Sequence, residues 1–109
     1  MSSEEVVRWT RSSGVAVAHM RGELDLSTAG EAFSALTDGR RDGVLVIDLT
    51  EVEFMDSTAL GHLVAFGEDE VIRIVAPDGT APRRVLEITK LTARFPTFET
   101  VDDATAAER

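Results

Sequence analysis

The 109-residue sequence predicts one α/β domain, spanning residues 1–109, in which helices pack on a mixed sheet of four to five strands. Three observations favour this class. Segments with strand patterning alternate with segments of helical periodicity, in the order ββαβαβαβα. Residues 44–49 are apolar almost throughout, as is typical of a central strand covered on both faces. Hydrophobic residues make up 43% of the chain, enough for a single modest core.

The first part of the chain predicts a hairpin followed by a helix. Residues 6–11 and 15–24 are patterned as strands, and residues 12–14, Ser-Ser-Gly, form the turn between them. Thr28 and Glu31 then have the spacing of a capping box, which places a helix start at Thr28. Asp38-Gly39 ends this helix. Its apolar face consists of Ala29, Ala32, Phe33 and Leu36.

The central part of the chain predicts a buried helix that starts just after the central strand. Residues 40–43 form a charged turn into strand 44–49. Asp56, Ser57 and Thr58 are three consecutive side chains that can cap a helix start. We therefore expect Ser57 at the N-terminus of a helix, close to free backbone N–H groups. The face of this helix that packs on the sheet consists of Leu60, Leu63 and Val64, and Gly67 ends it.

The last part of the chain predicts two more strands, each followed by a helix. Residues 71–75 form a strand that ends at residues 77–79, Pro-Asp-Gly. Pro82 opens a short helix. Residues 97–100 form an edge strand, and a final helix spans residues 101–107. The core-facing residues of the short helix are Val85, Leu86 and Ile88. Parallel crossovers in such a sheet are expected to be right-handed.

Composition excludes several classes of function. A formal net charge of −9 argues against a nucleic-acid partner and against anionic membrane surfaces. No apolar run approaches the roughly 18 residues that a membrane span needs, and the first residues do not resemble a signal peptide. The absence of cysteine excludes disulfides and cysteine-ligated zinc. We therefore expect a cytoplasmic protein without a membrane partner.

Several polar residues follow the predicted strands. The carboxyl ends of parallel strands meet at one edge of a sheet. Asp25 and Thr28 follow the second strand, and Asp48, Asp56 and Ser57 follow the third. Asp25 should therefore lie near the Asp56-Ser57 pair. For Asp48 we expect a structural role instead, in which it holds a loop through backbone hydrogen bonds.

Catalytic and metal-binding roles for these residues are weakly supported. Three acids along one edge can bind a divalent cation, but no histidine, cysteine or glycine-rich phosphate loop accompanies them. Ser57 lacks a G-x-S-x-G elbow. His62 follows it by five residues, which is not a facing position, and His19 is expected on a strand surface. We predict no catalytic residue, no metal, no cofactor and no enzyme activity. Taken locally, Asp56 and Ser57 also fit a simple helix cap.

Three blocks of sequence resemble a known family. Residues 22–25, GELD, with residues 27–29, STA, are similar to a GELD-x-x-TA segment. Residues 45–61, LVIDLTEVEFMDSTALG, are similar to a central block that ends in DSSGLG or DSTGLG. Residues 86–91, LEITKL, and 95–98, FPTF, precede an acidic last helix. In this order the blocks resemble the STAS domain, in the branch of bacterial anti-sigma factor antagonists, and cover nearly the whole chain.

The resemblance implies a partner-switching regulator of transcription in the stress response. Such a protein binds an anti-sigma factor that is also a serine kinase, and so releases a sigma factor. Phosphorylation of the serine in the DS pair, here Ser57, ends the binding, and a PP2C-type phosphatase restores it. Thr58 is the weaker candidate acceptor. The implied protein is a monomer or weak dimer. The partner-binding residues that the resemblance implies are Asp25, Thr28, Asp56, Ser57, Thr58 and Ala59.

The chain departs from the family pattern at three places. Ala59 stands where the family often has glycine, which favours helix after Ser57. Lys90 also replaces a common glycine. The segment 57–71 is about one helical turn shorter than usual, which changes the surface at the far end of the central helix.

Two other functions remain open from the sequence. Some STAS domains are subunits of a larger signalling assembly or of a lipid-transport complex. A phosphoaspartate receiver is the alternative from a different class, with Asp48 as its acceptor. Receivers also need paired acids after the first strand and a late lysine. Here Ser12 and Ser13 follow that strand, and the only lysine, Lys90, lies outside the predicted strands.

Overall fold

A five-stranded mixed sheet forms the centre of the structure, a computed structural model that describes residues 7–39 and 43–107. The strands are β1 (Val7–Ser12), β2 (Val15–Leu24), β3 (Leu45–Met55), β4 (Ile72–Val75) and β5 (Thr97–Phe98). They lie in the sheet in chain order. β1 and β2 pair antiparallel, and the other neighbours pair parallel. Val6 and residues 40–42, which were assigned to the first strand and to a turn, lie outside the described residues.

Four α-helices and one 3-10 turn complete the described chain. They are α1 (Ala29–Gly39), α2 (Ser57–Gly67), α3 (Ala81–Ile88), η2 (Leu91–Ala93) and α4 (Val101–Ala106). The observed order confirms the predicted ββαβαβαβα arrangement, and the 3-10 turn is the only added element in the part of the chain described. The last strand and helix are shorter than predicted, because β5 ends at Phe98 and α4 at Ala106.

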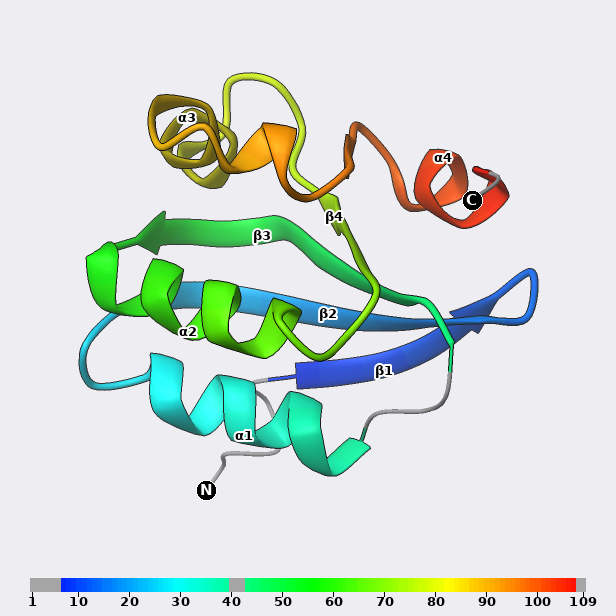
Figure 1. Ribbon diagram of the computed structural model, residues 1–109, viewed down its shortest axis with the longest axis horizontal. Coiled ribbons are helices and arrows are strands. Elements are labelled where there is room, and N and C mark those ends of the chain that lie inside the picture. Colours follow the sequence, from blue (N-terminus) through cyan, green and yellow to red (C-terminus); the bar gives the residue numbers. More distant parts are fainter. Residues whose placement is uncertain (1–6, 40–42, 108–109) are drawn as a thin grey trace.

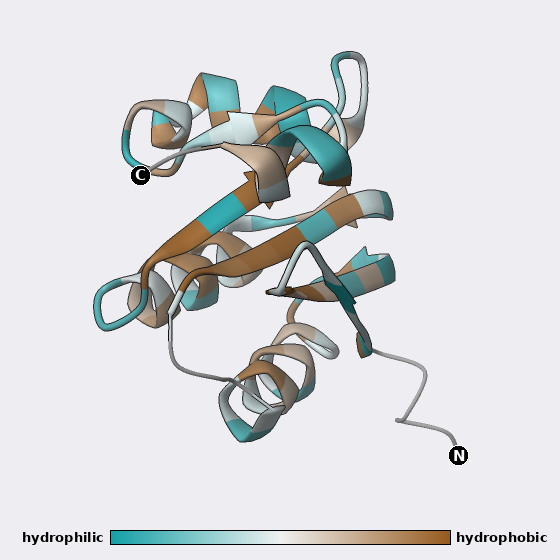
Figure 2. Ribbon diagram, turned by 90° about the vertical axis from the view of Figure 1, so that its right-hand side faces the viewer, coloured by the Kyte–Doolittle hydropathy of each residue, from teal (hydrophilic) through white to brown (hydrophobic). Residues whose placement is uncertain are grey.

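The helices are distributed around the sheet as Figure 1 shows. α1 and α2 lie side by side against the sheet, and α4 lies apart from them beside the sheet. α3 lies next to the distal half of β3, because β4 pairs only with the first part of that strand. Figure 2 shows that hydrophobic colour runs along the central strands. The helices thus cover the apolar centre of the sheet.

The core confirms most of the predicted packing of α1 and α2. Phe33 and Leu36 of α1 and Leu63 of α2 are buried in one large cluster with Ile47 of β3. Leu60 and Val64, also predicted to be buried, are only partly covered. They line a shallow groove that faces Thr89 and Leu91. Leu60 and Val64 therefore lie at the margin of the core.

β3 is longer than the predicted strand 44–49 and continues to Met55. Its second half is exposed at Glu51, Glu53 and Phe54. Two register irregularities interrupt its pairing with β2, and Gly22, at the second, has a positive φ of 80°. This half pairs with β2 alone among the described strands, and its sequence mixes apolar and charged residues, so it lacks the continuous apolar pattern from which strand 44–49 was predicted.

α3 has the predicted Pro82 in its first turn but differs from the prediction in its buried face. Thr80 caps the helix by accepting a hydrogen bond from the Arg83 N–H. Leu86 is fully buried, whereas Ile88, which was predicted to face the core, is 72% exposed. Two residues correspond to about 200° around a helix, so Leu86 and Ile88 face opposite directions. The expected inward position of Ile88 was wrong.

Candidate functional site

The loops that follow β2 and β3 meet at one edge of the sheet. Leu24 and Met55 are register partners at the ends of these strands, and the Asp56 N–H donates to the Leu24 carbonyl at 3.2 Å. One residue further along, the Leu26 N–H donates to Asp56 Oδ2, also at 3.2 Å. The predicted proximity of the Asp25 loop to Asp56 is therefore confirmed.

Asp56 fixes the start of α2. Its Oδ1 accepts a hydrogen bond from the Ala59 N–H at 3.0 Å, the geometry of an N-cap. Ser57 is the first residue of the helix and its side chain is exposed. Within the described residues, the Ser57 hydroxyl makes no hydrogen bond. The structure thus places an accessible hydroxyl at the N-terminus of α2, as the sequence predicted.

The two residues after Ser57 are less accessible. Thr58 is half-buried, and Ala59 is fully buried in the main core. The methyl group of Ala59 is therefore accommodated within the core. Ala59 contributes to this site through its backbone N–H, which donates a hydrogen bond to Asp56.

Asp25 organises the loop between β2 and α1. Its Oδ1 accepts hydrogen bonds from the Ser27 hydroxyl at 2.8 Å and from the Ser27 N–H at 2.9 Å. These bonds hold the pKa of Asp25 below the ordinary aspartate value, with a smaller contribution from Thr28. Asp25 is therefore a carboxylate at neutral pH, and its orientation is fixed by its own loop.

Thr28 does not form the predicted capping box with Glu31. Its hydroxyl instead donates to the Glu23 carbonyl at 2.6 Å and accepts from the Asp25 N–H at 2.9 Å. Residues 26–28 form turns before α1 begins at Ala29. These turns direct the Thr28 hydroxyl back toward the end of β2, where it holds the Asp25 loop.

Two exposed apolar side chains near this edge were missed by the sequence reasoning. Leu26, in the loop next to Asp25, is 79% exposed, and Phe54, two residues before Asp56, is 47% exposed. Leu26 could have been noticed as a single apolar residue within a polar loop. Phe54 lies beyond the predicted strand 44–49, in a part of β3 where no strand was expected. Each is one or two residues from a carboxylate of the site.

Asp48 lies away from the site, contrary to the expectation that it follows the third strand. It is buried within β3, and its Oδ2 is 2.7 Å from His19 Nδ1. Its Oδ1 accepts the Thr50 N–H at 3.0 Å, at the first irregularity between β2 and β3. Its role is structural, but it holds an irregular strand and not a loop. A receiver needs an accessible acceptor at a strand end, so this position argues against the receiver alternative.

The histidines also lie outside the site. The other ring nitrogen of His19 is 2.7 Å from the Thr10 hydroxyl, so this half-buried residue links β1, β2 and β3. The His62 ring stacks on Phe33, with ring centroids 5.8 Å apart. Neither imidazole has a hydrogen bond to Ser57 in the described part of the chain. Residues 7–39 and 43–107 also contain no group of three or more potential metal ligands, and none of their helices is long and apolar enough to span a membrane.

Comparison with known proteins identifies the family. The model of the STAS domain matches residues 7–104. The chain belongs to the STAS domain family. The anti-sigma-F factor antagonist RsfB of Mycobacterium tuberculosis is 36% identical over 103 residues, which cover 89% of this chain and 84% of RsfB. This STAS domain therefore belongs to the branch of anti-sigma factor antagonists.

Solved structures agree with this assignment. A crystal structure of an anti-sigma factor antagonist from Mycobacterium paratuberculosis superposes with a TM-score of 0.81 at 36% identity, covering 90% of this chain and 88% of the other. The unphosphorylated antagonist SpoIIAA shares the fold at 18% identity, with a TM-score of 0.61 over 90% of this chain and 91% of SpoIIAA. The observed sheet and helices are thus those of a STAS domain.

Proposed function

We propose that this STAS domain is an anti-sigma factor antagonist that binds an anti-sigma factor while Ser57 is unmodified and thereby releases a sigma factor. The observation that carries the proposal is the accessible Ser57 hydroxyl next to Asp56, which is hydrogen-bonded to the Asp25 loop, in a chain 36% identical to an anti-sigma-F factor antagonist. Phosphorylation of Ser57 by a serine kinase, the anti-sigma factor itself, ends the binding. A PP2C-type phosphatase reverses the modification in the cytoplasm.

The position of Ser57 supports its role as the phosphate acceptor. A kinase needs access to the hydroxyl, and the Ser57 side chain is exposed. A helix N-terminus accommodates the phosphate because its N–H groups and dipole attract anions. Thr58, half-buried, is the weaker acceptor. Asp56 precedes the acceptor and holds the loop of Asp25 through the Leu26 N–H, and we propose that both carboxylates assist engagement of the kinase.

The surface around Ser57 suits a partner with both apolar and basic groups. Leu26 and Phe54 provide exposed apolar side chains, and Asp25 and Asp56 provide negative charge close to them. Interface centres are commonly apolar, with polar groups that fix orientation. Thr28 and Ala59 contribute indirectly, by holding the Asp25 loop and the first turn of α2. We propose that the antagonist acts as a monomer or weak dimer.

The acceptor can be tested with the purified cognate kinase and ATP. We expect acid-stable phosphoserine at Ser57, identified by mass spectrometry of peptides. Ser57→Ala should abolish the label, and the matched control Thr58→Ala should keep it. Label that persists in Ser57→Ala at Thr58 would show a shared acceptor. Acid-labile phosphate on Asp48 would contradict the proposal.

The partner can be tested by pull-down from cells that contain the native chain. Wild type and Ser57→Ala should capture the same anti-sigma factor. Ser57→Asp should capture less, because it places a charge at the interface. Capture of a larger signalling assembly or a transport complex, irrespective of the residue at position 57, would instead assign this STAS domain to such an assembly.

A further inference from the structure

Arg73 is a buried cation at the margin of an apolar cluster. It lies in β4, is only 7% exposed and is the register partner of Val46. Side chains alternate across a strand, so Arg73 faces the same side of the sheet as Val46 and Val75. Those two valines form a small buried cluster with Val17 and Ala104. A guanidinium group therefore occupies a position that an apolar side chain would fill at lower cost in desolvation.

No carboxylate neutralises Arg73 within the described residues. One guanidinium nitrogen donates to the Ala104 carbonyl of α4 at 2.6 Å, and the described chain offers it no ion pair. This contact uses one of five N–H donors. Arg83 is a useful contrast, because it is more exposed and yet contacts Glu87 and Glu99 at 3.0 Å each. The chain has 20 acidic residues, so the lack of a partner for Arg73 does not reflect a shortage of carboxylates.

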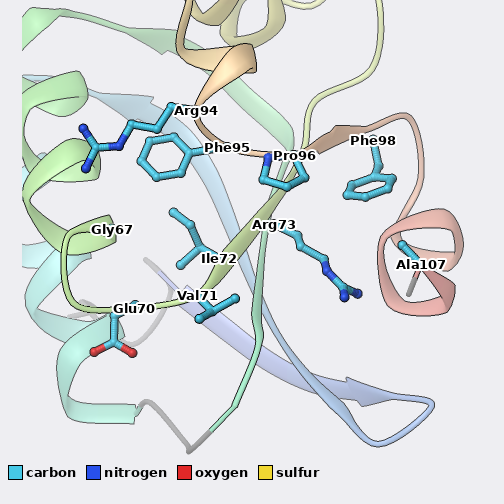
Figure 3. Close-up of a pocket in the computed structure, with 10 residues that line it drawn as sticks. All are labelled: Gly67, Glu70, Val71, Ile72, Arg73, Arg94, Phe95, Pro96, Phe98 and Ala107. Atoms are coloured by element: carbon cyan, nitrogen blue, oxygen red, sulfur yellow. The ribbon is translucent and has the colours of Figure 1, made fainter. Parts of the chain in front are cut away.

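A cavity lies beside this unneutralised charge. Its volume is about 410 Å³, and Arg73 is among the residues that line it, together with Ile72, Phe95 and Phe98. Figure 3 shows the Arg73 guanidinium extending from β4 toward Ala107, while the Arg94 side chain lies on the opposite side of the cavity. The Arg94 guanidinium carbon lies 5.2 Å from the centre of the Phe95 ring. The volume falls within the roughly 300–1,000 Å³ of typical small-molecule sites.

We propose that this cavity is a binding site for a small monocarboxylate with an apolar body. A planar carboxylate matches the guanidinium fork of Arg73 and supplies the missing negative charge. The apolar part of the lining, which includes Ile72, Phe95 and Phe98, covers a short hydrocarbon or ring, and the charged side chains of Glu70 and Arg94 also line the cavity. A free inorganic anion lacks that apolar body, and an uncharged alcohol lacks the charge. Recognition therefore requires both parts of the ligand.

The site is separate from the proposed phosphorylation site. Gly67, which lines the cavity, is the last residue of α2, whereas Ser57 is the first. Eleven helical residues span about 16 Å. Binding at the cavity does not depend on the anti-sigma factor proposal, and each can fail without the other.

The test is a titration of the whole chain with sodium hexanoate, followed by amide chemical shifts. We expect saturable shifts at Ile72, Arg73 and Phe98. Acetate keeps the charge but lacks the apolar body, so it loses the burial of four methylene groups. 1-Hexanol keeps the apolar body but lacks the hydrogen bond of a carboxylate to the charged guanidinium. Each should bind at least about tenfold more weakly than hexanoate. Equal binding of hexanol and hexanoate would overturn the proposal, as would shifts confined to the groove of Leu60 and Leu91.

Variants assign the binding to Arg73. Arg73→Met keeps the length of the side chain and removes the charge, so it should lose the saturable shifts. Arg73→Lys keeps a charge without the planar fork and should bind with intermediate affinity. The matched control is Arg84→Met, which removes an exposed arginine of α3 that does not line the cavity. Unchanged hexanoate affinity in Arg73→Met would show that Arg73 only holds α4. If that variant does not fold, the comparison of hexanoate with hexanol in the wild type still decides the question.

Discussion

At the scale of single residues, Asp56 has two structural roles, one for each carboxylate oxygen. Oδ1 caps α2 through the Ala59 N–H, and Oδ2 holds the Leu26 N–H of the neighbouring loop. Loss of a cap costs about 0.5–2 kcal/mol. We expect Asp56→Ala to lower the free energy of unfolding by about 1–3 kcal/mol, because both bonds are lost. Asp56→Asn, which keeps one acceptor oxygen, should retain part of this stability in urea melts. Equal losses in the two variants would contradict the division of roles.

Asp25 gives a second prediction, on the pH dependence of stability. Because the hydrogen bonds from Ser27 lower its pKa in the folded state, the ionised carboxylate stabilises the fold above its ordinary pKa, about 3.9. This contribution is lost as the pH falls through the lower, folded value. Wild type should therefore lose more stability than Asp25→Asn between about pH 4 and pH 2. Melting temperatures over this range measure the difference, and Ser27→Ala should reduce the slope. Parallel curves for wild type and Asp25→Asn would argue against the bonds.

Single residues also show what local sequence can and cannot predict. The cap at Asp56 was predictable because its partner is three residues away, and a short spacing fixes that geometry. Asp48 was placed wrongly because its partner His19 lies 29 residues away and meets it only after β2 and β3 pair. The exposure of Leu26 depends on the path of a turn, which apolar patterning does not specify. The burial of Arg73 and the cavity beside it were likewise not predictable from the local sequence.

At the scale of elements, α2 contains two glycines with opposite surroundings. A methyl group at Gly61 would have open space around it, whereas at Gly67 it would lie 2.5 Å from the Phe95 ring. Phe95 is buried and has little room to move. Gly61→Ala should therefore stabilise the domain by about 0.5–1 kcal/mol through helix propensity. Gly67→Ala should destabilise it by about 1–3 kcal/mol through the clash. Urea unfolding of both variants tests the pair, and a stabilised Gly67→Ala would show that the ring moves aside.

Strand and helix boundaries were predicted where the sequence pattern is regular and missed where tertiary pairing decides them. α1 and α2 have clear apolar periodicity, and their extents were correctly predicted. The second half of β3 was missed because it pairs on one side only and has charged side chains at intervals. Lys90 shows the same limit, because it replaces a common glycine and still adopts the left-handed conformation, with φ of 65°. In this conformation Lys90 caps the η2 turn, and its carbonyl accepts the Ala93 N–H at 3.2 Å.

At the scale of the whole molecule, phosphorylation of Ser57 should change the interface and not the fold. Phosphate adds about −1.5 to −2 charge at pH 7. That charge is locally favourable at the N-terminus of α2. It also lies next to Asp56, which contacts the Asp25 loop, on a chain with net charge −9, and must be desolvated against a partner. We expect amide shifts confined to the site and an almost unchanged melting temperature.

The single charge of Ser57→Asp is smaller than that of phosphate, so this variant should weaken partner binding less than phosphorylation does. Ser57→Ala should bind the partner about as well as wild type, which controls for loss of the hydroxyl. Shifts throughout the sheet, or a melting temperature lowered by several degrees, would indicate a conformational switch and refute the electrostatic explanation.

The strand order has a consequence for how the chain reaches its native state. Each strand lies next to the strand that precedes it in sequence, from the β1–β2 hairpin to β5. A hairpin forms through local contacts, and each later strand finds its neighbour already in place. The sheet can thus grow in the direction in which a ribosome delivers the chain. The short β5 and the six-residue α4 come last, so Phe98 and Ala107, which line the Arg73 cavity, and the Ala104 carbonyl that Arg73 contacts are added only when almost the whole domain has been synthesised.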